Sequence, residues 1–307
     1  ASKGAQVDVV DAIAPAGGST RHALGLIAPQ PTALQATLHS IADVQRVAQA
    51  LGVPVQPTTA LYIARDEAEA KVLRAAITQA TPDAAEWVDS ASGLPEGCAG
   101  AVMFREALMT DVPALVQHML RAPGVNVHAP VEVLKLEQLR GQTAIVANGY
   151  VATAQYIVLA TNAFAGLLSP YLADSVAFAH GIAWTSHAGT TSNLPMPVVT
   201  ADGTFAALQQ AAERCVHALA WSEDDKASSP EALLEHWLRA FGVDPIRQMH
   251  KREQVVTTCS PTADGMPLIG QLGEDGRVLY AMGAGLFGVV WAAHIAEQLW
   301  QLATHTS

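Results

Sequence analysis

The sequence contains few cysteines and few charged residues. Cys98, Cys215 and Cys259 are its only cysteines, and they lie far apart without CxxC spacing. The sequence therefore indicates neither a disulfide framework nor a zinc site, and we expect no bound metal and a reducing, cytoplasmic location. Charged residues make up only 15% of the 307 residues, which argues against extended disorder away from the termini.

Basic residues and long hydrophobic runs are scarce as well. The chain has 17 basic and 28 acidic residues, for a formal net charge of -11. This charge repels phosphate backbones and anionic membranes, so we do not expect nucleic acid as a partner. The uncharged stretch at residues 278–293 is short and contains several glycines. It therefore indicates a buried strand, turn and helix and no membrane span.

The beginning of the chain lacks both an initiator Met and the apolar core of a signal peptide. We expect from this that the chain was processed, split or trimmed from a longer one. Half of the residues are hydrophobic, enough to bury a substantial core in one large domain or in two joined domains.

Strand and helix patterns alternate along the chain. Val7–Asp11 is a β-branched run that ends in a carboxylate, which is typical of an inner strand of a parallel sheet. Asp111 is expected to cap a helix with Pro113 near its start, followed by a strand, as in the crossover of a Rossmann-like domain. Asn148-Gly149 predicts a tight hairpin. Further helices are predicted at residues 33–51, 67–79 and 230–241, and a last one runs from the glycine turn after residue 282 to about residue 301. Strands are predicted at residues 61–64, 125–128, 131–136, 142–146, 150–154, 156–160 and 277–282.

Asp11 ends the first predicted strand, where a Rossmann domain commonly places an acid that accepts the ribose hydroxyls of an adenosine. A solvated acid is the alternative. The following segment, Ala16–Gly25 (AGGSTRHALG), is similar to the loop after the ribose-binding acid in the D-amino-acid oxidase superfamily. This resemblance implies that Gly18, Ser19 and Gly25 contact the cofactor. An ordinary glycine-rich surface loop remains the other interpretation.

A second segment, residues 156–163 (YIVLATNA), resembles the strand of that superfamily that ends in an Ala-Thr-Gly-Ala turn beneath FAD. The resemblance implies that Ala160, Thr161 and Asn162 lie at the cofactor, and it adds Val133 to the same set. Asn162 replaces the usual glycine. Because Asn tolerates a left-handed backbone better than other non-glycine residues, we expect the turn to keep its geometry.

The third and most specific segment is the C-terminal one, residues 261–270 (PTADGMPLIG) and 279–288 (LYAMGAGLFG). It resembles the C-terminal signature of the superfamily, in which the last helix points its N-terminus at the flavin. The resemblance implies cofactor contacts for Asp264, Gly283, Gly285 and Gly288. The three glycines also spell GxGxxG, but no second strand and ribose-binding acid follow them, so we do not interpret them as the primary dinucleotide fingerprint.

The resemblance spans nearly the whole chain and implies an α/β fold with an α+β substrate part. It implies an FAD-binding Rossmann-like domain, N-terminally incomplete, made of residues 1-50, 107-175 and 256-307. A mixed-sheet substrate domain of residues 51-106 and 176-255 is interleaved with it. The implied activity is an FAD-dependent oxidation of the C–N bond of a small amine or amino acid.

Two departures from the superfamily affect this prediction. The strand, GxGxxG turn and helix that hold the FAD pyrophosphate have no counterpart before Val7. We expect a separate N-terminal segment or subunit to complete the sheet; the alternative is a chain that no longer binds FAD. Cys259 also occupies the place of an arginine that pairs with the substrate carboxylate, a role that Cys cannot fill. Arg252 or Lys251 is the candidate replacement, with a solvated strand edge as the alternative.

Two other functions remain open at this point. The missing fingerprint and Cys259 suit a non-catalytic relative that acts as a scaffold or subunit partner. Gly25–Pro29 (GLIAP) also resembles the oxidase domain of bacterial enzymes that modify the wobble uridine of tRNA, although the acidic charge counts against tRNA binding. The histidines at positions 180, 187, 217 and 250 receive no role.

Overall fold

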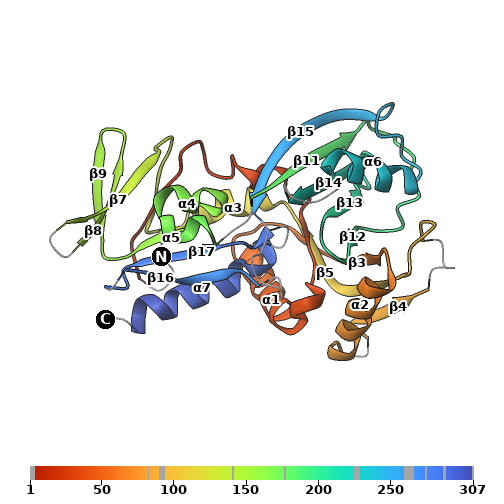
Figure 1. The fold of residues 1–307 in the computed structure, drawn as a ribbon, viewed down its shortest axis with the longest axis horizontal. Helices are drawn as coiled ribbons and strands as arrows, with labels where there is room; N and C mark the ends of the chain where they lie inside the picture. The colour runs from red at the N-terminus through yellow and green to blue at the C-terminus, as the bar shows by residue number, and fades with distance from the viewer. Residues whose placement is uncertain are drawn as a thin grey trace.

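The computed structural model describes residues 4–81, 83–89, 94–139, 142–175, 178–223, 229–258, 266–273, 275–285 and 288–305. Their strands form one large mixed sheet and three small sheets, and helices cover them, which confirms the predicted fold class. Figure 1 shows the small sheets at one end of the molecule, together with both termini, and the curved large sheet at the other.

The large sheet is made of nine strands. Neighbouring strands run antiparallel, except that β12 and β3 are parallel. In spatial order the strands are β15 (Met249–Thr258), β11 (Phe178–Ser186), β14 (Val216–Glu223), β13 (Phe205–Gln209), β12 (Val198–Thr200), β3 (Val55–Ala64), β5 (Gly100–Thr110) and β2 (Leu26–Ile27), with β4 (Ala85–Val88) also paired to β5.

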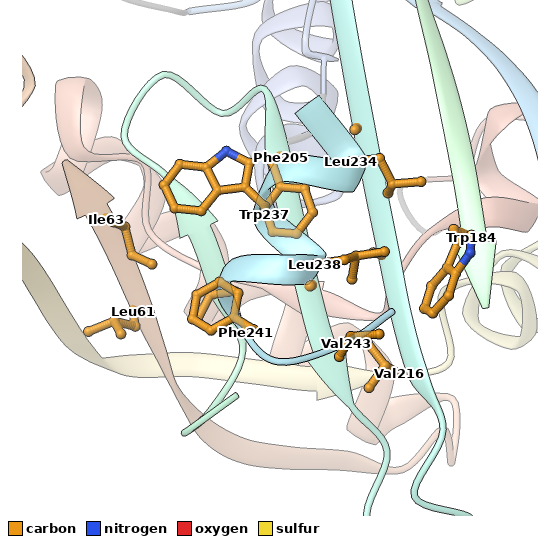
Figure 2. Packing of buried hydrophobic residues seen from close by; sticks show 14 of the residues in the cluster. Leu61, Ile63, Trp184, Phe205, Val216, Leu234, Trp237, Leu238, Phe241 and Val243 are labelled. Atoms are coloured by element: carbon orange, nitrogen blue, oxygen red, sulfur yellow. The ribbon is translucent and has the colours of Figure 1, made fainter. Parts of the chain in front are cut away.

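One face of this sheet packs against α6 (Pro230–Ala240). The helix starts as its sequence predicts, because Ser229 Oγ accepts a hydrogen bond from Ala232 N at 3.2 Å and a proline follows at the first position. Trp237 of α6 stacks on both Phe205, at 5.9 Å between ring centroids, and Phe241, at 6.4 Å. Figure 2 shows these rings above the strands of the sheet. Burial of three large rings makes this cluster a main source of hydrophobic stabilisation.

The other face carries α2 (Glu67–Gln79), while α1 (Leu34–Ala50) and α7 (Gly288–His305) pack on each other beside it. Asp66 caps α2 by accepting a hydrogen bond from Glu69 N at 2.9 Å. A buried hydrogen bond of 2.9 Å from Trp291 Nε1 to Gln30 Oε1 joins α7 to the segment that leads into α1.

The small sheets come from the segments assigned to the cofactor domain. Strand β1 (Val7–Val10) pairs in parallel with β6 (Val125–His128). Strand β10 (Ile157–Leu159) pairs in parallel with β17 (Val278–Met282), which is antiparallel to β16 (Leu268–Leu272). The third sheet is a meander of β7 (Val133–Leu139), β8 (Gln142–Ala147) and β9 (Tyr150–Ala154). The domain limits themselves stay a prediction.

Several local predictions agree with the structure. The hairpin at Asn148-Gly149 joins β8 and β9. Asp111 caps α3 (Val112–Leu120), accepting a hydrogen bond from Ala114 N at 2.9 Å. The structure adds short elements that the sequence patterns did not indicate: η1 (Ser19–His22), η2 (Pro31–Ala33), η3 (Asn162–Phe164), α4 (Ala165–Leu168) and α5 (Pro170–Ala173). None of the described helices is long and apolar enough to cross a membrane.

Two buried tryptophans allow a test of the hydrogen-bond contribution in the core. Trp184 Nε1 donates to the carbonyl of Pro245 at 3.1 Å, whereas Trp237 Nε1 has no acceptor among the described residues. We expect Trp184→Phe to lower the free energy of unfolding by about 1 kcal/mol more than Trp237→Phe, because only the first substitution leaves a buried carbonyl without its donor. Urea denaturation of both variants measures the difference. Equal losses of unfolding free energy in the two variants would contradict a stabilising hydrogen bond from Trp184 to Pro245.

Candidate functional site

The predicted cofactor residues follow the carboxyl ends of parallel strands. Asp11 follows β1, the turn of Ala160, Thr161 and Asn162 follows β10, and the glycine turn that begins at Gly283 follows β17. Because ligands of open α/β sheets bind outside the carboxyl ends of their strands, this is the edge at which a nucleotide is expected. η3, which begins at Asn162, contacts β17, the strand that leads into the Gly283 turn. η3 and η1 both contact β15 of the large sheet.

Asp11 is held by three hydrogen bonds at the end of β1. Its backbone N donates to His128 O at 3.1 Å, its backbone O accepts from Val131 N at 2.8 Å, and its Oδ1 accepts from Ile13 N at 2.8 Å. In the described part of the chain only this one carboxylate oxygen is engaged, which leaves the second for a ligand. Val133, the first residue of β7, is half-buried and lies two residues beyond the segment bonded to Asp11.

The glycine-rich loop is built around two glycines with different environments. Gly18 precedes η1, has a φ of -79°, and has open space where a Cβ would lie; Ser19 beside it is exposed. Gly25 is buried with a φ of +79°, and a Cβ there would lie 2.4 Å from Thr110 O. Its carbonyl accepts a hydrogen bond from Thr110 N at 3.0 Å. Gly25 therefore fixes the end of the loop to β5, while Gly18 leaves the loop open to a ligand.

The turn after β10 has the geometry expected from the sequence. Asn162 adopts a φ of +49°, the left-handed conformation in which it takes the place of a glycine. Gly283 and Gly285 also have positive φ values, of +74° and +51°. They lie just before α7, whose first described residue is Gly288, and the N-terminal turn of this long helix carries a partial positive charge.

The structure separates the substrate-side candidates on β15. Arg252 faces α6, where its Nη2 contacts Glu231 Oε1 at 2.8 Å, and its cross-strand neighbour Trp184 belongs to the core beneath that helix. Lys251 and Glu253 alternate to the opposite face, the one that η1 contacts. The predicted residues Cys259 and Asp264 lie outside the described residues.

A polar cluster lies on that second face, and no sequence motif pointed to it. Arg21 and His22 of η1 lie against Glu253, which also pairs with Lys251. The only signal for it was an Arg-His pair inside a loop of small residues. Among the histidines left without a role, burial lowers the pKa of His217, and the rings of His187 and His250 meet edge to face at 5.4 Å.

A small apolar cavity of about 40 Å³ is lined in part by Ala23 and Leu24, which directly follow η1. Its walls come from the loop after η1, the central strands of the large sheet and the start of α7, and include Leu24, Tyr62, Val199 and Val290. Burial raises the pKa of Tyr62. The cavity has room for ordered water.

The two loop glycines give a matched test of this geometry. We expect Gly25→Ala to lower the free energy of unfolding by about 2 kcal/mol, because it combines a strained positive φ with a clash against Thr110 O. A Cβ at Gly18 would meet no atom within 4 Å, so we expect a smaller loss of stability for Gly18→Ala than for Gly25→Ala. Thermal and urea denaturation measure both. Equal effects of the two substitutions would contradict the described loop.

Comparisons with known proteins show the family and the fold of the chain. The chain matches the model of the family described as FAD dependent oxidoreductase (DAO) over residues 1–302. Its fold is similar to glycine oxidase from Geobacillus kaustophilus, with a TM-score of 0.77 and 16% identity over 98% of this chain and 88% of that one. L-proline dehydrogenase from P. horikoshii gives a TM-score of 0.80 and 16% identity, over 99% and 88% of the two chains.

A third similar structure is that of dithionite-reduced L-alpha-glycerophosphate oxidase from Mycoplasma pneumoniae with FAD bound. It gives a TM-score of 0.74 and 14% identity, over 97% of this chain and 88% of that one. No curated protein matches the chain. At these identities the solved structures bear on the fold alone.

Proposed function

Because this chain belongs to the FAD-dependent oxidoreductase family, we propose that it oxidises the C–N bond of a small amine or amino acid. The observation that carries the proposal is the arrangement of Asp11, the left-handed Asn162 turn and the Gly283 turn at the carboxyl ends of parallel strands. Two of the similar folds, glycine oxidase and L-proline dehydrogenase, are named for substrates with a C–N bond.

The described residues fit parts of an FAD molecule. Asp11 has a carboxylate oxygen available for ribose hydroxyls. The open space at Gly18 admits a ligand close to the backbone, and α7, whose N-terminus carries a partial positive charge, follows Gly283 and Gly285 in the chain. When bound, FAD supplies the ring that accepts the hydride, and the chain's own groups bind and orient it. The described residues offer no glycine turn for the pyrophosphate after a first strand.

We propose that a further strand, turn and helix, supplied as a separate N-terminal segment, completes the site between β1 and β10. Val7 N bonds to Gly124 O on the β6 side, so the backbone groups of Asp8 and Val10 face the opposite edge of β1. Ile157 N bonds to Arg277 O on the β17 side, so the backbone groups of Val158 face the other edge of β10. These edges suit a parallel strand, because each offers N–H and C=O groups that its one described neighbour does not use.

The first test is whether flavin binds. The purified chain is mixed with FAD, alone and together with a strand–glycine turn–helix segment, and its visible spectrum and retained flavin are measured. Stoichiometric flavin with the segment supports the proposal, and oxidation of amines in preference to glycerol 3-phosphate supports the C–N assignment. A folded protein that binds no FAD in either mixture would overturn the proposed oxidation. The remaining interpretation would then be a non-catalytic relative that acts as a scaffold or subunit partner.

Asp11 gives a residue-level prediction for the flavin-binding preparation. We expect Asp11→Ala to weaken FAD binding at least about tenfold, because the carboxylate offers charge-assisted hydrogen bonds to the ribose. Asp8→Ala is the control, since Asp8 is on the same strand but bonds to His128 and Asn126. Quenching of flavin fluorescence measures both affinities. Equal losses for the two variants would remove Asp11 from the site.

The open edge of β10 gives a second prediction. Val158→Pro removes an N–H from the free edge and leaves the bonds to β17 in place, so we expect it to weaken binding of the added segment about tenfold or more with little change in melting temperature. Val158→Ala keeps the N–H and is the control. Binding is measured with a fluorescently labelled segment. Undiminished binding to the proline variant would place the segment elsewhere.

A further inference from the structure

The glycine-rich loop at residues 16–25, called here the cofactor loop, and strand β15 of the large sheet, called here the substrate sheet, are joined by four charged or polar side chains. Arg21 and His22 belong to η1, which directly follows Gly18, and Lys251 and Glu253 belong to β15. Arg21 Nη2 lies 3.5 Å from Glu253 Oε1, and Lys251 Nζ lies 2.6 Å from Glu253 Oε2. This junction links residues 232 positions apart in the sequence.

His22 lies at the centre of the junction, and its neighbours determine which ring nitrogen carries the proton. Arg21 Nε donates a hydrogen bond of 2.8 Å to His22 Nε2. A guanidinium has no acceptor atom, so Nε2 must be the unprotonated nitrogen and Nδ1 must carry the hydrogen. Nδ1 in turn faces Glu253 Oε2 at 3.7 Å, where its N–H is electrostatically favoured. The neutral ring therefore points its acceptor at a cation and its donor at an anion.

The environment of His22 favours the neutral ring. Its side chain is only 7% exposed, against 56% for Arg21. Burial, and then the charge of Arg21, lower the pKa of His22; Glu253 acts in the opposite direction and Lys251 adds to the lowering. The other element packed on η1 is α3, whose one titratable residue, His118, contacts Ala114 O of its own helix through Nδ1 at 2.8 Å.

We propose that neutral His22 is a positioning residue that holds the cofactor loop against the substrate sheet, and that a proton on Nε2 releases the loop. The added proton removes the acceptor for Arg21 Nε and places two cations side by side. The pH dependence of the junction follows from linkage. The pKa of His22 in the closed junction is below the usual value of about 6.5, so protonation favours the open loop. The closed junction is therefore fully stable above the usual histidine pKa and is lost as the pH falls through the lowered pKa of His22.

The junction bears on the proposed function because η1 is part of the loop assigned to FAD. Release of η1 would weaken the hold of Gly18 and Ser19 on the cofactor at low pH. This regulation rests on the proposed function, whereas the junction itself is present in the chain without cofactor and is tested there. Measurements on the cofactor-free chain can therefore contradict the junction without contradicting the proposed function. A chain that binds no FAD can contradict the proposed function without contradicting the junction.

The test measures hydrogen exchange of the loop amides in the cofactor-free chain. Arg21 N and Ala23 N, which bond to Gly18 O and Thr20 O, report on opening of η1. After correction for intrinsic exchange rates, we expect the opening constant to rise about fivefold or more between about pH 7.5 and pH 5.5. His22→Gln cannot titrate and should remove this dependence. His39→Gln is the control, because His39 is 84% exposed on α1.

A second measurement is independent of any variant. Nitrogen-15 spectra of the wild-type ring at neutral pH should show Nδ1 protonated and Nε2 bare. A ring protonated at Nε2, or a pH dependence of loop exchange that persists unchanged in His22→Gln, would overturn the proposal.

Discussion

The buried hydrogen bond between Trp291 Nε1 and Gln30 Oε1 fixes the position of the elements around the candidate site. Gln30 follows the cofactor loop, and its N–H donates to Thr37 Oγ1 at 3.0 Å, at the start of α1. Trp291 lies in the first turn of α7, fully buried. This polar contact lies in an apolar cluster that includes Ile41 and Val44 of α1 and Val290 of α7, so it adds a directional bond to the packing of the loop, α1 and the N-terminus of α7. Loss of the Gln30 side chain would remove the acceptor of the buried Trp291 N–H.

A second constraint comes from the parallel strands. The pairs β1 with β6 and β10 with β17 each direct part of their backbone hydrogen-bonding groups away from the partner strand. Val158 of β10, whose backbone groups face the open edge, also has an exposed side chain. Apolar β-branched residues at such edges are characteristic of strands that receive a further neighbour. The proposed segment would therefore complete the backbone hydrogen bonding and the cofactor site together.

Local signals predicted much of this structure. The resemblance to the D-amino-acid oxidase superfamily is confirmed by the family match over residues 1–302. Asp111, the Asn148-Gly149 hairpin and the left-handed Asn162 were predictable because each depends on the conformation of a few consecutive residues. The helix predicted at residues 67–79 has the same bounds in the structure, since its cap and its amphipathic pattern lie within the segment.

The remaining features depend on contacts between distant segments. No local pattern indicates that Leu26–Ile27 pairs with β5, or that Arg252 turns to Glu231 while Lys251 and Glu253 turn to η1. The side chains of Arg252 and of its two neighbours point to opposite faces because successive residues of a strand alternate, and the sequence predicts this alternation. Which of the two faces carries α6 depends on the packing of the whole sheet, and the sequence does not predict it. Because His22 and Glu253 come from opposite ends of the chain, the junction at His22 forms only when η1 and β15 have both reached their places in the fold. A proton at one buried imidazole can then act on the cofactor loop without disturbing either hydrophobic core.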